Sequence, residues 1–334
     1  MQHIMKTSKV NAIIENRIRS SVLYNDIQTA LEQMCERLEI MAKSAEAHMG
    51  SDLSELLNSG GKRLRPILAF VCSRFGEKQM DIVPLMCMLE LMHTASLIHD
   101  DVVDGAVKRR EMPTINKKRG DFAAVQSGDY LLAKAMELLH IYKDTGINEM
   151  LAEVSYQMTV GELSQQAVRY EFNKQSATQY YELINKKSAL LIAASCGCGA
   201  IAGGVQSAQV GALYRYGQQL GMAFQLRDDL LDFSEQTGKA PGQDLKNGIF
   251  TLPILMLLES GVPEPVHRLL MKREKSDNEL LSLIEYVKGA QALSNVEDKI
   301  KEHVAVAQKE IDIMQSGNEK KALKELAESL SDKG

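Results

Sequence analysis

The stretch DDVVD at residues 100–104 returns, with the same spacing of acidic residues, as DDLLD at residues 228–232. On a helix of 3.6 residues per turn, the first and last carboxylates of each stretch lie four residues apart and the second and last lie three apart. Each trio can therefore point toward one place. Carboxylates gathered in one cavity repel each other unless a cation compensates their charge. Each acidic motif thus predicts half of a metal site.

Ligands that are all oxygen are typical of a hard ion such as Mg²⁺, which commonly also binds the phosphate oxygens of a substrate. A single motif of this kind is equally well explained as a solvated polar face of a helix. Two copies, on segments otherwise rich in Leu, Ile, Met and Ala, favour a functional site instead. We therefore expect a substrate that carries phosphates.

The composition of the 334-residue chain favours helices over strands. Hydrophobic residues make up 45%, aromatic residues only 5%, Trp is absent and there are 17 Met, as expected for packing of Leu, Ala and Met between helices. The segments 82–98, 130–142, 150–167 and 213–233 keep a helical pattern. No linker divides the chain. We predict one all-α domain over residues 1–334, with about residues 1–25 as an N-terminal helical extension.

Charge and cysteine usage exclude several classes of protein. The net charge of -5 leaves no broad basic surface for nucleic acid. The five Cys form no pair of CxxC motifs, and their odd number argues against a disulfide framework. Residues 1–21 lack the apolar core of a secretory signal. The longest uncharged run, 189–205, is rich in Ala, Gly, Ser and Cys, which favours a closely packed buried helix over a membrane span. We expect a cytoplasmic protein.

Positive charge is concentrated near the acidic motifs. The stretch GGKRLRP at residues 60–66 precedes an apolar segment, and its glycines loosen the backbone where cationic side chains must converge. A Lys point charge and a planar Arg fork together suit a diphosphate. Alone, the stretch is better explained as an exposed surface loop. Together with Arg109 and Arg110, just after the first acidic motif, it predicts a cleft bordered by cations and carboxylates.

These motifs together resemble the trans-isoprenyl diphosphate synthases, the polyprenyl synthetase family, and most of all its medium-chain and long-chain members such as the catalytic subunit of heptaprenyl diphosphate synthase. The matching stretches are GGKRLRP (60–66), ELMHTASLIHDDVVD (90–104), RR (109–110), GD (128–129), KSA (187–189), FQLRDDLLD (224–232) and GQDLKNG followed by TLP (242–253). The resemblance implies a single-domain isoprenoid synthase fold, whose helices surround a deep central cavity with the acidic motifs facing each other across its mouth.

The resemblance also implies a reaction. Members of this family join isopentenyl diphosphate head-to-tail to an allylic diphosphate, release pyrophosphate and make an all-trans polyprenyl diphosphate in an Mg²⁺-dependent prenyl transfer. By resemblance, a cluster of three Mg²⁺ is held, directly or through water, by Asp100, Asp101, Asp104, Asp228, Asp229 and Asp232. The residues expected to take part in catalysis are Asp100, Asp101, Asp104, Asp228, Asp229, Lys187 and Gln225.

The same resemblance assigns the substrate contacts. The allylic diphosphate is expected to contact Arg109, Lys187 and Lys246. Isopentenyl diphosphate is expected to contact Lys62, Arg65, His93 and Arg110, although His93 considered alone would more often be a core histidine. Ser188 and Gln225 supply polar oxygens near the carbocation. Because Ile249 stands where many members carry Lys, we expect binding to depend more on Lys239 and Lys246.

Small residues precede the first acidic motif. On a helix, Ser96 lies one turn below Asp100, Ala95 lies beside Ser96, and Met92 lies about a turn deeper. Short-chain family members place bulky aromatic residues there, so the resemblance predicts a product longer than farnesyl diphosphate. In the alternative interpretation, Ala95 and Ser96 only allow close helix packing. The cavity floor is then formed higher up by Met92, Leu131 or Met136, and the product is geranylgeranyl or farnesyl diphosphate.

Two other functions remain open at this point. A terpene cyclase also ionises allylic diphosphates, but it has no need of the isopentenyl-binding GGKRLRP set. A partner-dependent or regulatory subunit is the third possibility, although such subunits usually lose an acidic motif and both motifs are intact here. By resemblance we expect a homodimer without a transmembrane segment, and some long-chain members need a small second subunit.

Overall fold

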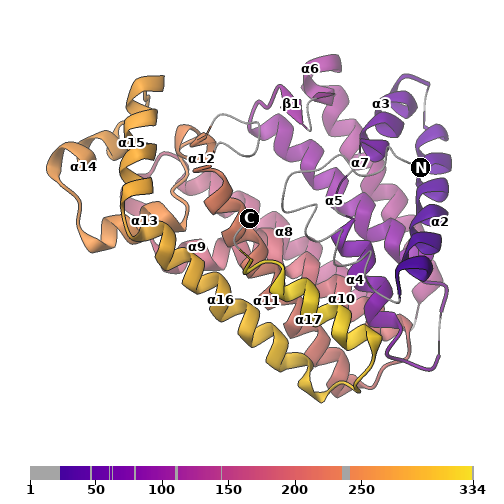
Figure 1. Cartoon of the computed structure of the whole chain (residues 1–334). Coiled ribbons are helices and arrows are strands. Elements are labelled where there is room, and N and C mark those ends of the chain that lie inside the picture. Colours follow the sequence, from indigo (N-terminus) through magenta and orange to yellow (C-terminus); the bar gives the residue numbers. More distant parts are fainter. Residues whose placement is uncertain are drawn as a thin grey trace.

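The computed structural model describes residues 23–45, 47–59, 61, 63–78, 80–109, 112–143, 145–234 and 241–332. The longer helices are α2 (Tyr24–Lys43), α3 (Ala47–Asn58), α4 (Leu64–Ser73), α5 (Val83–Val103), α7 (Asp121–Leu138), α8 (Ile147–Val168), α9 (Ala177–Ile184), α10 (Leu190–Ala202), α11 (Ser207–Leu231), α13 (Leu252–Ser260), α14 (Glu264–Met271), α15 (Asp277–Gly289), α16 (Ala292–Glu310) and α17 (Asn318–Glu328). The all-α prediction is confirmed (Figure 1). Nearly all of the expected N-terminal extension lies outside the described residues.

Short elements join these helices. They are α6 (Ile115–Arg119), α12 (Gln243–Lys246), the 3₁₀ turns η1 (Leu139–Tyr142), η2 (Phe172–Lys174) and η5 (Ile311–Ile313), and the π-helical turn η3 (Asn185–Ala189). The strands found in the described part of the chain are β1 (Lys108–Arg109) and β2 (Met112–Pro113), which pair antiparallel with Arg109 opposite Met112. This two-stranded hairpin follows the first acidic motif directly.

Helices α5, α8, α10 and α11 form the centre of the molecule, while α16 and α17 run along its outer side (Figure 1). Helix α5 packs on α7, and α11 packs between α10 and α16. Most positions of α5 are buried, from Val83 to Asp101, which explains its nearly continuous apolar sequence. A helix that is apolar on all sides is expected in the interior of a large domain.

Glycines allow the backbones of central helices to touch. A Cβ placed at Gly199 of α10 would lie 2.2 Å from the carbonyl oxygen of Ala69 in α4, and one at Gly221 of α11 would lie 2.6 Å from the Cα of Ala189. Helix α10 covers most of the uncharged run at 189–205 and is almost wholly buried, so the prediction of a closely packed buried helix is confirmed. The five cysteines are free thiols.

Across the described ranges, none of the helices combines the length and the apolar character that crossing a membrane requires.

Candidate active site

Both acidic motifs lie where a helix ends. Helix α5 ends at Val103 with Asp104 as its C-cap, and α11 ends at Leu231 with Asp232 as its C-cap. The first two aspartates of each motif therefore sit in the last helical turn, and the third sits just beyond it. Negative charge at a helix C-terminus opposes the helix dipole by about 0.3–1 kcal/mol. A bound cation would offset this cost, so the placement favours an ion site over a purely structural role.

The first aspartates of the two motifs line one cavity of about 690 Å³. Residues from α4, α5, β1, α7, α8, η3, α10 and α11 contribute to its wall. Its ionisable lining residues are Arg63, Arg65, Glu90, His93, His99, Asp100, Arg109, Glu162, Lys187 and Asp228. The structure thus brings together groups that are more than a hundred residues apart in the sequence.

The cavity wall combines charged and apolar side chains. Along α5 the lining passes from Asp100 to Ser96 and then to Met92, which are about one helical turn apart. Along α8 it passes from Glu162 to Met158. Leu132 and Ile192 add further apolar surface. The charged end of the cavity, beside the acidic motifs, is thus continued by apolar side chains, as an amphiphilic substrate requires.

Lys187 is held at the charged end by residues of α8. Its ammonium lies 2.5 Å from the Glu162 carboxylate, donates a hydrogen bond of 2.7 Å to Gln165, and lies 3.8 Å from Asp100. Burial lowers the pKa of Lys187, but the nearby Asp100 and Glu162 carboxylates outweigh it and raise the pKa above its ordinary value. Lys187 therefore stays cationic. It belongs to the π-helical turn η3, a local widening that occurs frequently at functional sites.

The aspartates of the first motif have different surroundings. Burial raises the pKa of Asp100 to about 6, with Glu162 and Asp104 adding to the rise and Lys187 and Arg109 opposing it. Asp101 is buried and accepts hydrogen bonds from Arg109, at 2.9 Å from Nε and 2.7 Å from an amino nitrogen. Asp104 lies 3.2 Å from the guanidinium of Arg169.

The aspartates of the second motif are also distinct from one another. Asp228 lines the cavity, whereas Asp229 is buried and accepts a hydrogen bond from the hydroxyl of Tyr180. Burial raises the pKa of Asp229 well above its ordinary value. Asp232 instead accepts hydrogen bonds from the backbone amides of Gln243 and Asp244, at 3.1 and 3.3 Å. It therefore caps α12.

Ser188 and Gln225 form a linked pair next to Asp229. The Ser188 hydroxyl donates a 2.8 Å hydrogen bond to the side-chain oxygen of Gln225, whose amide nitrogen lies 3.3 Å from Asp229. Both residues line the cavity. The structure thus places the two predicted polar side chains together at the charged end.

The donor set suits Mg²⁺. Within the residues that the structure describes, no three Asp, Glu, His or Cys side chains are grouped as ligands of one ion. Mg²⁺, however, usually binds through one or two carboxylates and completes its shell with water and substrate phosphates. Asp100 and Asp228, lining the same cavity from α5 and α11, supply oxygen donors of this kind. The residues present therefore fit the ion.

Among the predicted basic residues, Arg65 has a buried nitrogen without a hydrogen-bond partner among the described atoms. Its side chain is partly buried, and this burial lowers its pKa to about 10, opposed by Glu90 and Asp228. Arg65 lines the cavity, and the buried nitrogen without a partner is its Nε. A buried donor of a cation is costly when it stays unused, and a bound anion would remove that cost. His93 lines the same cavity.

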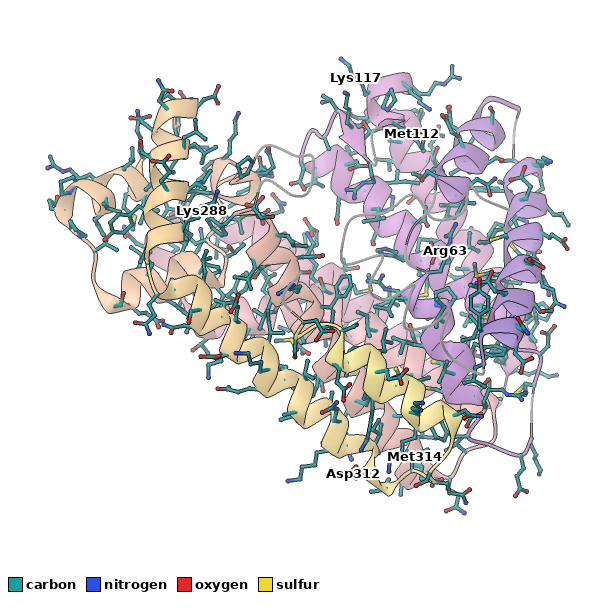
Figure 2. All side chains as sticks on the ribbon, in the orientation of Figure 1. Arg63, Met112, Lys117, Lys288, Asp312 and Met314 are labelled. Atoms are coloured by element: carbon teal, nitrogen blue, oxygen red, sulfur yellow. The ribbon has the colours of Figure 1, made fainter. Side chains whose placement is uncertain are left out.

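Arg109, another predicted basic residue, also lines the cavity. Lys62, Arg110 and Lys239 fall outside the described residues. Lys246 is about half exposed and lies 3.6 Å from Asp277 of α15, and it does not belong to the cavity lining. Arg63, which had no predicted role, is a buried left-handed residue at the start of α4 and pairs with Glu90. Figure 2 shows Arg63 within the helical assembly, far from the peripheral Asp312.

The three residues expected to control product length are placed differently. Met92 and Ser96 line the cavity, whereas Ala95 is fully buried in the packing around α5 and is not part of the lining. The Ser96 hydroxyl donates a 2.8 Å hydrogen bond to the carbonyl of His93. Of the alternative floor positions, Leu131 is buried and Met136 is exposed, while the cavity wall contains their neighbour Leu132.

Sequence reasoning missed Glu162, Gln165, Arg169 and Tyr180, which hold Lys187, Asp104 and Asp229. One signal could have found the first two. The mostly polar stretch GELSQQ at 161–166 interrupts the apolar pattern of the helix predicted at 150–167. Glu162 and Gln165 are spaced three residues apart, so they lie on one face of that helix. Arg169 and Tyr180 carried no comparable signal.

Comparison with known proteins is consistent with this geometry. Residues 46–287 match the family model described as polyprenyl synthetase. The chain is similar to heptaprenyl diphosphate synthase component 2 of Geobacillus stearothermophilus, with 38% identity over 72% of this chain and 76% of the relative. Its structure resembles heptaprenyl diphosphate synthase from Staphylococcus aureus, with a TM-score of 0.86, 30% identity and coverage of 91% of this chain and 98% of that chain.

A second solved structure includes ligands. Polyprenyl synthase from Caulobacter crescentus, described as complexed with calcium and isoprenyl diphosphate, matches with a TM-score of 0.86 and 30% identity, over 99% of this chain and 100% of that chain.

Proposed function

From the premise that the chain belongs to the polyprenyl synthetase family, which makes it a prenyltransferase, we propose its specific reaction. The protein condenses isopentenyl diphosphate head-to-tail with an allylic diphosphate, in the presence of Mg²⁺, to make an all-trans polyprenyl diphosphate longer than farnesyl diphosphate. One observation supports this most. The 690 Å³ cavity has Asp100, Asp228 and Lys187 in its wall together with Met92, Leu132 and Ile192, so a diphosphate and a prenyl tail can be bound together.

Departure of the diphosphate from the allylic carbon leaves a carbocation and builds negative charge on the leaving oxygens. Fixed positive charge in a site that excludes water lowers this barrier. Bound Mg²⁺ supplies electrostatic stabilisation of the leaving diphosphate. The residues that would hold the ions are Asp100, Asp101, Asp104, Asp228, Asp229 and Asp232. Lys187, which the surrounding acids keep cationic, binds the same diphosphate, and so does Arg109.

The chain's own residues then guide the second substrate. We assign Arg65 and His93, which line the cavity, to the diphosphate of isopentenyl diphosphate, together with Lys62 and Arg110. Gln225 and Ser188 turn polar oxygens toward the allylic carbon as it becomes positive. The double bond of isopentenyl diphosphate attacks that carbon through its terminal CH₂, which forms the new carbon–carbon bond and moves the positive charge to the third carbon of the isopentenyl unit. A proton then leaves the second carbon of that unit for the pyrophosphate, and its electron pair forms the new double bond.

The product is proposed to be longer than farnesyl diphosphate because Ser96, one turn from Asp100, is small and lines the cavity. A tail can therefore extend past this position toward Met92. Growth stops where apolar side chains close the cavity.

The test is incubation of purified protein with Mg²⁺, isopentenyl diphosphate and allylic primers of increasing length, followed by sizing of the dephosphorylated products. Chelation with EDTA should abolish turnover, and Mg²⁺ should restore it. Asp228→Ala should lower kcat by about 10²-fold or more, while Asp298→Ala, a matched change on the exposed surface of α16, should not. Absence of any condensation product would contradict the function, whereas a geranylgeranyl or farnesyl product would contradict only the proposed length.

Assembly is part of this proposal. The Geobacillus relative is named component 2 of its enzyme, so we propose that full activity of this chain, as a homodimer, also involves a small second subunit. Light scattering after size exclusion measures the homodimer. The incubation above, repeated with and without the candidate subunit, measures its effect on turnover.

A further inference from the structure

Helix α8 is followed by an unusual corner. The helix ends at Val168, and Tyr170, two residues later, has a φ of 61°. This left-handed conformation is uncommon for a bulky side chain. Such residues persist where the surrounding structure fixes them, often near functional sites. We therefore expect the corner at Arg169 and Tyr170 to be held by specific contacts with neighbouring segments.

The corner binds the end of α12 and the residues that follow it. Arg169 Nε donates a 2.8 Å hydrogen bond to the carbonyl of Asn247, and the Tyr170 amide donates one of 3.0 Å to the carbonyl of Gly248. The Tyr170 hydroxyl lies 3.4 Å from the carbonyl of Lys246. These carbonyls belong to a helix end, where backbone acceptors lack partners within the helix. The fit is tight, because a Cβ at Gly248 would lie 2.3 Å from the Tyr170 ring.

The other end of α12 is bound by the second acidic motif. The amides of Gln243 and Asp244 donate to the carboxylate of Asp232 at 3.1 and 3.3 Å. The amide of Gly242 also donates to the Asp232 carbonyl, at 2.8 Å. Helix α12 is thus fixed between the last aspartate of the second motif and the corner after α8.

Arg169 extends this connection to the first acidic motif. One of its amino nitrogens lies 3.2 Å from the carboxylate of Asp104 while its Nε is bonded to Asn247. Only 16% of its side chain is exposed, so both contacts are partly shielded from water. A planar guanidinium can hold two partners in different directions at once, which a Lys ammonium on a flexible stem does less well.

We propose that Arg169 is a positioning residue that couples the two acidic motifs. It joins Asp104 at the end of α5 to the segment 242–248, whose first amides are bonded to Asp232 at the end of α11. The inference rests on the proposed function insofar as both aspartates belong to the motifs that are proposed to hold the metal ions. It adds a residue outside the acidic and basic motifs that fixes where their carboxylates lie. Asp104 and the end of α12 are then connected through the hydrogen bonds of a single guanidinium, that of Arg169.

Hydrogen exchange measures this link without turnover. In Arg169→Ala, the peptide covering residues 241–250 should exchange at least about tenfold faster than in the unchanged protein. Asp104→Asn should also accelerate this peptide, although Asp104 lies on a different segment, because it anchors the same guanidinium. In the double variant the exchange should be no faster than in Arg169→Ala alone. Independent, multiplicative effects, or no effect of Arg169→Ala, would overturn the proposal.

Two further variants separate positioning from general stability. Arg273 lies at the same corner, with its guanidinium 5.0 Å from the Tyr170 ring, and Arg273→Ala should leave the 241–250 peptide unchanged. Arg169→Lys should give intermediate exchange, because Lys retains the charge opposite Asp104 and loses the second contact. If Arg169→Ala fails to fold, Arg169→Lys carries the test. Equal acceleration by Arg273→Ala and Arg169→Ala would contradict the inference.

Kinetics provide a second readout. Arg169→Ala should raise KM for the allylic diphosphate and the Mg²⁺ concentration at half-maximal rate about tenfold, with kcat changed less than about threefold. A loss in kcat alone would argue against positioning. If the unchanged protein makes no product while the exchange coupling is present, the proposed function fails and the coupling stands. If product forms and the exchange coupling is absent, the proposed function stands and the role of Arg169 is wrong.

Discussion

The hydroxyl of Tyr180 donates a hydrogen bond to the buried carboxylate of Asp229. Burial raises the pKa of both groups well above their ordinary values, so the phenol remains a donor throughout the neutral range. A residue of α9 thereby determines the orientation of an aspartate of the second acidic motif on α11. The acidic motifs are thus supported by side chains from outside the motifs.

Replacing Tyr180 by Phe should destabilise the protein by about 1–3 kcal/mol, because the buried carboxylate of Asp229 loses a hydrogen-bond donor. Urea unfolding measures the loss. Tyr181→Phe is the matched control on the same helix, since Tyr181 is only half-buried and its ring packs 6.1 Å from that of His303. Equal shifts in the two variants would argue against a special role for the bond to Asp229.

Asp100→Asn should stabilise the protein in EDTA at pH 8. The folded pKa of Asp100 is raised to about 6 by burial, so ionising this carboxyl costs free energy that the unfolded chain avoids. The cost is absent below about pH 4, grows as the pH rises through 6 and is complete above it, reaching at most about 3 kcal/mol. Urea unfolding at pH 4 and pH 8 should therefore show a difference only at the higher pH. A difference independent of pH would contradict the assignment.

Arg65→Gln should raise KM for isopentenyl diphosphate at least about tenfold, or about 1.4 kcal/mol in binding, with a smaller change in kcat. The partly buried guanidinium, with its buried and unpartnered Nε, provides the charge that an incoming diphosphate neutralises. Steady-state kinetics with varied isopentenyl diphosphate measure the effect. Arg74→Gln, just past the end of the same helix, serves as the control, and a similar rise there would exclude a specific role for Arg65.

Ser96→Phe should shorten the product, because the side chain at position 96 lines the cavity. Ala95→Phe tests the neighbouring position that the sequence also suggested. Since Ala95 is fully buried, Phe should mainly overpack the helix contact there and cost about 1–3 kcal/mol. Sizing of the dephosphorylated products distinguishes the variants. Ser96→Thr is the control, because Thr is close in size to the original Ser. An unchanged product in Ser96→Phe would contradict a tail path beside this residue.

The helices were predictable from the sequence because their apolar pattern is strong. The segment predicted at 82–98 is α5 (Val83–Val103), that at 150–167 is α8 (Ile147–Val168), and that at 213–233 is α11 (Ser207–Leu231). Helical spacing also placed both acidic motifs at related positions. Helical spacing did not predict that adjacent aspartates of one motif would have different hydrogen-bond partners. Successive helical residues point about 100° apart, so Asp100 faces the cavity while Asp101 turns to Arg109.

Residues that support the motifs could not be inferred in the same way. Tyr180 and Arg169 reach their aspartates through tertiary packing between helices that are distant in sequence. The π-helical turn that carries Lys187 has no recognisable pattern in a single sequence. Lys246, expected at the allylic diphosphate, lies beside Asp277, a contact that depends on where α15 packs.

Two glycine contacts between the central helices limit how this enzyme can diversify. With Gly199 against Ala69 and Gly221 against Ala189, not even a methyl group fits between these backbones. A larger residue at Gly199 or Gly221 would therefore push these backbones apart and cost stability, whatever it did to the product. Evolution or engineering toward other prenyl chain lengths has its freedom at side chains that line the cavity, such as Met92, Leu132 and Met158 on α5, α7 and α8.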